Sequence, residues 1–164
     1  MDFKAAAVHG VNSFIWSKLQ EDLGWTAVNG LVPITTPQET PEFQDAGQPY
    51  IIYNYSTSNV EGNYGIKNQT VVYAIMSPRE SDVRQGLNLV EYYLGGEDLS
   101  AEDVNAHVET VTGQPFSQFD YKSITAKQST GGAPTEQEGG FMDSRFEFTI
   151  KYTSSRVRGF EPTV

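Results

Sequence analysis

The sequence predicts an α+β domain with a mostly antiparallel sheet, an N-terminal helix and a central helical segment packed on one face. Apolar residues recur at three- and four-residue spacing near the N-terminus and again in the middle of the chain, as in core-facing helices. Runs rich in Tyr, Phe, Val and Ile come in pairs before and after the central helical segment. The chain has 164 residues, the size of one domain, and we expect a single domain over residues 1–164.

Residues 2–22 are predicted to form the first helix, with Asp2 as its cap and Gly24 as its stop. Its apolar positions, which we expect to face the core, are Val8, Val11, Ile15 and Leu19. Residues 31–49 contain four prolines, which predicts an extended connector with one short edge strand at about residues 32–35.

Residues 50–57 and 70–76 are predicted to form two strands of a long hairpin. In the first strand, Tyr50 and Ile52 lie on one face and Ile51 and Tyr53 on the other. Because both faces are bulky, we expect a central strand that is covered on both sides.

A second helix is predicted to follow, with Ser77 as its cap and Pro78 in its first turn. Gly95 and Gly96 end it, and a shorter helix begins at Ser100. The predicted core positions of the two helices are Val83, Leu87, Val90, Leu94, Val104 and Val108.

The last two strands are predicted at residues 116–127 and 141–152. In the final strand, apolar residues alternate with polar ones, which predicts one buried and one solvent-facing side; the apolar residues are Phe146, Phe148, Ile150 and Tyr152. Residues 128–140 are low in complexity and predict a projecting loop. Residues 153–164 predict a mobile C-terminal tail.

Composition excludes several classes of function. The chain has 21 Asp and Glu against 11 Lys and Arg, a net charge of −10, so a basic surface for nucleic acid is not expected. It has no Cys, which removes disulfides, thiolate metal sites and cysteine nucleophiles. We see no secretory signal and no apolar run long enough for a membrane span, and we expect a soluble cytoplasmic protein.

No pattern typical of catalysis appears, and we predict that the protein is not an enzyme and has no cofactor or metal. His9 and His107 fall in different predicted helices, and neither has metal-ligand spacing to a second histidine. Asp103 lies one turn before His107, which predicts a surface helix pair. The Gly-rich segments lack the Lys-Ser/Thr that follows a phosphate-binding loop.

Charge is segregated along the chain. The predicted corner before the short helix is acidic and contains Glu97, Asp98, Glu102 and Asp103. The C-terminal part is basic and contains Arg145, Lys151, Arg156 and Arg158. Solvated surface explains both groups without any function. The functional hypothesis is a head-to-tail interface, in which the basic end of one copy meets the acidic corner of the next.

The arrangement of the whole chain resembles that of the tail terminator and tail-completion proteins of tailed bacteriophages. The residues that carry the resemblance are the N-terminal amphipathic helix, the Pro-rich connector, PYIIYNYSTSN, TVVYAIMSP, the helix from SDVRQGL onward and the final FEFTIKYTS. The short helix at residues 101–110 and the long late loop are departures from that layout.

The resemblance implies a structural virion protein that is assembled in the host cytoplasm. It would form a hexameric ring that caps the tail tube and joins it to the head–tail connector, with DNA passing through the lumen without specific binding. The alternatives are another neck or tail ring, such as a connector or sheath-level terminator, and a small monomeric binding module.

In this setting, the late loop is either a surface loop without a role or an arm that contacts the tail tube or a neighbouring subunit. The residues of that predicted arm are Thr130, Gly131, Gly132, Ala133, Pro134, Thr135, Glu136, Gln137, Glu138 and Gly139.

Overall fold

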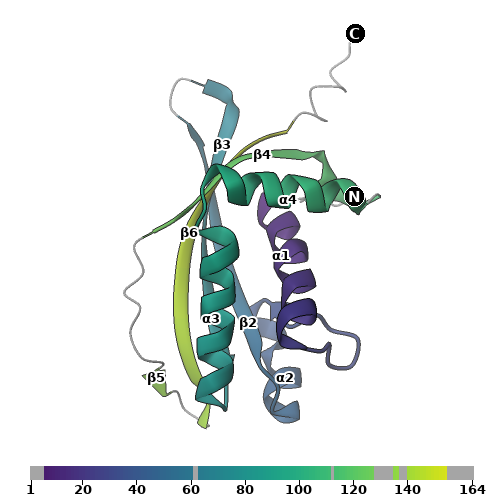
Figure 1. The fold of residues 1–164 in the computed structure, drawn as a ribbon, viewed down its shortest axis with the longest axis vertical. Helices are drawn as coiled ribbons and strands as arrows, with labels where there is room; N and C mark the ends of the chain where they lie inside the picture. The colour runs from purple at the N-terminus through teal and green to yellow at the C-terminus, as the bar shows by residue number, and fades with distance from the viewer. Residues whose placement is uncertain (1–5, 61–62, 112, 128–134, 137–139, 155–164) are drawn as a thin grey trace.

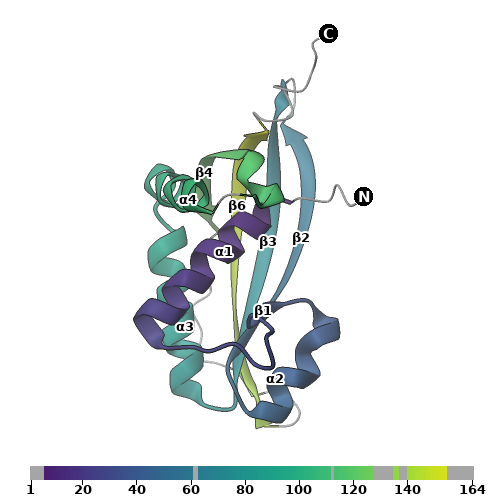
Figure 2. The same ribbon diagram turned by 90° about the vertical axis from the view of Figure 1, so that its right-hand side faces the viewer.

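The computed structural model has an α+β fold and describes residues 6–60, 63–111, 113–127, 135–136 and 140–154. A layer of three helices packs on one face of a twisted sheet (Figures 1 and 2). The helices of this layer are α1 (Ala7–Lys18), α3 (Glu80–Leu94) and α4 (Asp98–Thr110). The strands are β1 (Ile34–Thr35), β2 (Tyr50–Val60), β3 (Asn63–Ser77), β4 (Phe119–Ala126), β5 (Thr135–Glu136) and β6 (Met142–Ser154).

The strand order across the sheet is β1-β2-β3-β6-β4, and β5 pairs with β6. The predicted hairpin is confirmed, because β2 and β3 pair antiparallel from Tyr50↔Met76 onward. The sheet is mostly antiparallel, as predicted, but β1 pairs parallel to β2 through Ile34↔Ile51. A parallel pair needs a crossover between its strands, and the connector at residues 36–49 supplies one.

The main core lies between the three helices and the sheet. Every apolar position predicted for the helices is buried, from Val8 and Leu19 in the N-terminal segment to Val108 in α4. The predicted alternation in β6 is confirmed: Phe146, Phe148, Ile150 and Tyr152 are buried against the helices. Aromatic edges pack within this core, with the ring centroids of Tyr73 and Phe148 5.0 Å apart.

The prediction that β2 is a central strand was wrong for most of its length. Only its first residues are covered on both faces, where Tyr50 and Ile51 are fully buried. Beyond Ile52, β2 is the outer strand of the sheet, since β1 pairs only with Ile51 and Ile52. The bulky residues on both faces therefore reflect cover at the start of the strand alone, where Ile51 packs in the main core and Tyr50 packs against Phe43 and Phe141 on the other face.

The Pro-rich connector contains a helix that was not predicted from the sequence. A 3₁₀ turn, Pro37–Glu39, leads into α2 (Thr40–Ala46). Pro37 occupies the first helical turn, where a missing N–H costs nothing. Phe43 of α2 stacks on Tyr50 at 5.4 Å and, with Phe141, forms a second small core on the sheet face opposite the three helices.

Three predicted helix starts differ from those observed. The short helix, predicted to begin at Ser100, begins at Asp98 with Glu97 as its N-cap. The first helix is described from Ala7, with Ala6 as N-cap, and Asp2, its predicted cap, lies outside the described residues. It continues through a π-helical turn, Leu19–Leu23, to the left-handed Gly24. In the second helix, Arg79 is the N-cap, not Ser77. Ser77 Oγ instead accepts from the Arg79 N–H at 3.1 Å and donates to Asp82 at 2.9 Å, which fixes the turn just before the helix.

The late loop and the tail fall mostly outside the described residues. Within the loop, Thr135 and Glu136 pair with Asp143 and Met142 of β6. The segment is therefore held against the sheet at these two residues. The predicted mobile tail is described only at Thr153 and Ser154, which belong to β6.

Leu87→Ala is expected to lower the free energy of unfolding by about 2–5 kcal/mol, because Leu87 is buried between α3 and the sheet. The adjacent Asn88 is exposed, and Asn88→Ala is the matched control, with a change within about 0.5 kcal/mol. Urea unfolding of both variants measures the difference. A loss below about 0.5 kcal/mol for Leu87→Ala would contradict the burial of this helix face.

Gly10→Ala is expected to destabilise the protein, because a Cβ at position 10 would lie 2.1 Å from the Tyr121 hydroxyl oxygen. That hydroxyl donates to the Ala7 carbonyl at 2.6 Å, so the ring is not free to move aside. In a Tyr121→Phe background the same alanine should cost less, since the hydroxyl is gone. A double-mutant cycle of unfolding free energies measures this coupling, and additive costs would contradict the proposed clash.

Candidate functional site

The four acidic residues singled out from the sequence lie together at the start of α4. Gly95 and Gly96 end α3, and the Gly96 N–H donates to Ser100 Oγ at 2.8 Å, which turns the chain into the next helix. The Glu97 carbonyl accepts from the Ile124 N–H at 3.2 Å and so attaches this corner to β4. We call Glu97, Asp98, Glu102 and Asp103 the acidic row. All four are exposed, and within the described part of the chain their carboxylates form no ion pair.

The basic cluster is only partly described. Arg145 and Lys151 lie on β6 and point to the sheet face opposite the three helices, while Arg156 and Arg158 lie outside the described residues. Arg145 is paired within the subunit, its Nε lying 3.5 Å from an Asp143 carboxylate oxygen. Lys151 has no ion pair among the described residues. Of the two basic residues on β6, Lys151 is therefore the one that remains available to a neighbouring copy.

Lys151 borders a shallow polar cleft on this open sheet face. The cleft has a volume of about 500 Å³ and is lined mainly by hydroxyl, amide and charged side chains: Asn68, Thr70, Ser123, Thr125, Lys127, Glu147, Thr149 and Lys151. Lys127 and Glu147 form an ion pair across it at 3.2 Å. The Asn68 side-chain oxygen is buried here and has no hydrogen-bond partner among the described residues. The alternation in β6 predicted a solvent-facing side, but not a hollow in it.

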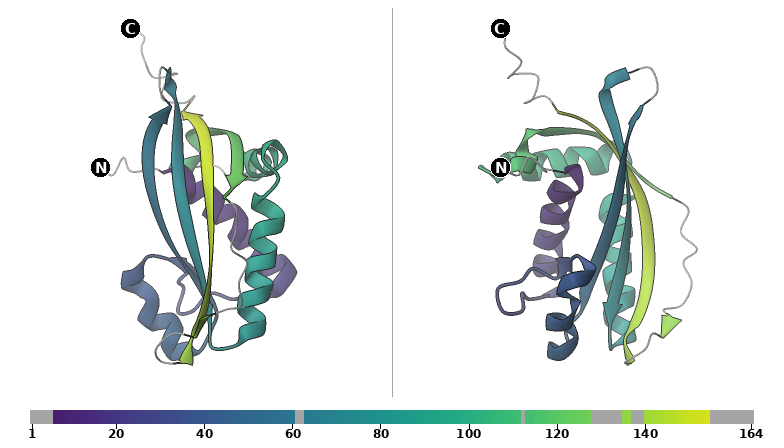
Figure 3. Two further views of the ribbon diagram at one scale, coloured as in Figure 1. Left: turned by 90° about the vertical axis from the view of Figure 1, so that its left-hand side faces the viewer. Right: turned by 180° about the vertical axis from the view of Figure 1, so that it is seen from behind.

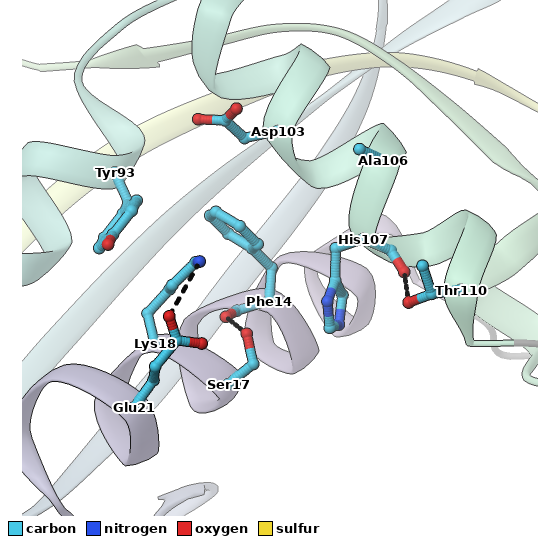
Figure 4. Close-up of a pocket in the computed structure, with 9 residues that line it drawn as sticks. All are labelled: Phe14, Ser17, Lys18, Glu21, Tyr93, Asp103, Ala106, His107 and Thr110. Atoms are coloured by element: carbon cyan, nitrogen blue, oxygen red, sulfur yellow. Dashed lines mark hydrogen bonds and ion pairs between the residues drawn. The ribbon is translucent and has the colours of Figure 1, made fainter.

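A second cleft of about 500 Å³ lies between α1 and α4, and Phe14 of α1 and Tyr93 of α3 are among the residues that line it (Figure 4). The Lys18 ammonium lies 5.7 Å from the centre of the Phe14 ring and 5.3 Å from that of Tyr93, positions that favour cation–π attraction. The Tyr93 hydroxyl donates to Asp22 at 2.7 Å, and this bond raises the pKa of Tyr93 to about 12.

His107 lines this cleft, and its contacts differ from those predicted. Its Nε2 lies 2.9 Å from Ser13 Oγ across the two helices, whereas no hydrogen bond links it to Asp103 among the described residues. Burial lowers the pKa of His107, and the positive charge of Lys18 lowers it further. A Ser–His pair becomes a nucleophile and base when a third group orients the imidazole. Here the geometry instead joins α1 to α4.

His9 packs against two aromatic rings, with its centroid 6.3 Å from those of both Tyr53 and Tyr55. It joins the N-terminal turn of α1 to β2. Over the described ranges, no group of three or more His, Asp or Glu side chains is placed to hold a metal ion.

Comparison with protein-family models and with curated protein sequences gives no match to this chain. In the part of the chain that the structure describes, no helix combines the length and apolar character needed to cross a bilayer.

His107→Gln is expected to flatten the dependence of stability on pH below about pH 6.5. Above that pH, the imidazole is neutral in the folded and unfolded states and contributes no pH dependence. As the pH falls through 6.5, the unfolded state takes up a proton before the folded state does, because the folded pKa is lowered. Folding therefore loses free energy in this window, and a glutamine removes that loss.

Urea unfolding at about pH 7.5 and about pH 5.5 measures the effect as the difference between the two free energies. Ser13→Ala is the control, because it removes the hydrogen bond and keeps the titrating imidazole. Equal drops for the parent protein and His107→Gln would show that His107 does not contribute.

Proposed function

We propose that the protein is a structural virion subunit: a phage tail terminator that assembles as a homohexameric ring, caps the tail tube and joins it to the head–tail connector. Its α+β layout, with an N-terminal helix and a central helical pair on one sheet face, is compatible with the family that the sequence resembles. Its two histidines serve as packing contacts between elements, which fits a structural role.

The observation that carries the proposal is that opposite charges with no ion pair among the described residues lie on different sides of the subunit. The acidic row lies on α4, in the helical layer, whereas Lys151 lies on the opposite sheet face. Because the sheet separates them, Lys151 cannot pair with the acidic row of its own copy. A head-to-tail contact between copies satisfies both, and repeated contacts of this kind close into a ring when the rotation allows it.

The net charge of −10 supports the second part of the proposal, passage of DNA through the ring. Phosphates bind where Lys and Arg neutralise them, and like charge prevents such contacts. A ring with a predominantly acidic surface allows DNA to slide without being held. A connector ring or sheath-level ring would use the same contact, and binding to purified tail tubes separates these roles from a terminator.

Lys151→Glu is expected to weaken ring formation and to reduce its salt dependence, because the reversed charge repels the acidic row of the neighbouring copy. A second variant with Glu102→Lys and Asp103→Lys should weaken assembly alone and restore it partly when combined with Lys151→Glu. Lys67→Glu is the matched control: it changes the net charge equally, and Lys67 has no ion pair in the described ranges.

Native mass spectrometry and negative-stain electron microscopy over a salt series measure the outcome. A monomer at all concentrations, with no binding to tail-tube ends, would overturn the proposed function. Assembly that responds equally to Lys151→Glu and Lys67→Glu would overturn the charge contact but keep the ring. Genes for portal, tail-tube and tape-measure proteins beside this one would support the same assignment independently.

A further inference from the structure

The two outer edges of the sheet differ in how their backbone groups are used. At the β4 edge, the Asn105 side chain of α4 donates to the Tyr121 carbonyl at 2.8 Å and accepts from the Tyr121 N–H at 2.9 Å. The Ile124 N–H donates to the Glu97 carbonyl at 3.2 Å. The outward N–H and C=O of Tyr121 and the outward N–H of Ile124 are thus already bonded within the subunit, which obstructs the addition of a second strand along β4.

The β2 edge is different beyond the short β1 pairing. The Ile51 N–H donates outward, to the Pro33 carbonyl of the β1 segment, at 2.8 Å. Since backbone direction alternates along a strand, Tyr55 and Thr57 direct their N–H and C=O groups to the same outer side. No described residue bonds to those outward groups of Tyr55 and Thr57. Figure 3 (right) shows this strand from the side on which the sheet lies in front of α1 and α3.

The open part of β2 also lacks the features that usually protect a sheet edge. Edge strands are blunted by Lys, Pro, short length or bulges. β2 is eleven residues long, and its sequence YIIYNYSTSNV contains no charge and no proline. Its register with β3 is regular until a shift between Asn59 and Val60, and residues 54–58 are exposed. A protein with a net charge of −10 thus presents a neutral strand along one edge.

We propose that two copies of this chain pair along β2, antiparallel and about a two-fold axis, so that their sheets become continuous. A two-fold contact requires a strand that is complementary to itself. Like charges directly opposite each other destabilise cross-strand pairs, and the neutral β2 brings none together. A head-to-tail continuation from β2 to β4 is blocked, because Asn105 and Glu97 occupy the β4 edge.

The outward groups define the centre of the pairing. With the two-fold axis at Ser56, Tyr55 of one copy is opposite Thr57 of the other and exchanges both backbone hydrogen bonds with it. Ser56 is then opposite Ser56 of the second copy in a non-hydrogen-bonded pair, whose Cβ atoms approach to about 4.5–5.5 Å. This contact uses the edge farthest from α4, so it goes beyond the proposed ring and does not depend on the acidic row.

Single cysteines test the two-fold axis directly, because the parent chain has no Cys. Ser56→Cys is expected to form a covalent dimer under mild oxidation, at least about tenfold faster than the control Ser81→Cys on the exposed start of α3. A residue on a two-fold axis meets itself, whereas a head-to-tail ring brings different residues together. Cross-linking no faster than that of Ser81→Cys would overturn the proposal.

Charge at the same position gives the second test. Ser56→Lys alone and Ser56→Glu alone should each dissociate the pair roughly fivefold more readily, because like charges face each other. An equimolar mixture should restore a mixed dimer, measured by native mass spectrometry, with circular dichroism to check the fold. Failure of the mixture to form the mixed dimer would overturn the proposal. The proposal would also be overturned if β2 paired only with a strand of a different protein.

The two proposals fail separately in this design. Lys151→Glu is expected to leave the Ser56→Cys cross-link intact, because it alters only the proposed contact between Lys151 and the acidic row of a neighbouring copy. Loss of the ring with retention of the cross-link would remove the proposed ring contact alone. Loss of the cross-link with retention of the ring would remove the β2 contact alone.

Discussion

Tyr121 joins three elements of the fold, and the candidate surfaces depend on it. Its buried hydroxyl donates to the Ala7 carbonyl of α1, in the space that Gly10 leaves free. The Asn105 side chain of α4 bonds both the backbone N–H and the carbonyl of Tyr121. Burial raises the pKa of Tyr121 far above its usual range, so the hydroxyl remains a donor at any physiological pH. This one residue therefore fixes α1, α4 and β4 relative to one another, and with them the acidic row and the α1–α4 cleft.

The periodic spacing of apolar residues predicted correctly which face of a helix or strand is buried. The helical spacing of Val83, Leu87, Val90 and Leu94 and the alternation from Phe146 to Tyr152 each describe one buried face, and all of these residues are buried. The helix α2 was not predicted because a packing contact that no periodic pattern shows, the stacking of Phe43 on Tyr50, holds it against the sheet. Prolines suggested an extended chain, but Pro37 also suits a first helical turn.

The same limit applies to the candidate sites. The sequence located the acidic row and the basic strand residues, because charge is visible along the chain. It did not reveal that Arg145 is already paired with Asp143, two residues earlier on the same side of β6. Nor did it show that Asn105 serves as a surrogate strand partner for Tyr121, since an Asn inside a helix gives no sign of what it bonds. Whether a strand lies at the edge of a sheet depends on the strand order, and the periodic spacing of apolar residues does not reveal that order.

The occupied and open edges have a consequence for any assembly of this chain. A ring built by joining sheets edge to edge needs two available edges per subunit, and the β4 edge is obstructed at Tyr121 and Ile124. In the proposed ring, the contact would therefore run through side chains, such as the acidic row and Lys151, and would weaken with salt. The β2 contact is made by backbone hydrogen bonds between uncharged residues and should resist salt. If both contacts form, two rings stack through their β2 edges, and high salt should leave dimers rather than monomers.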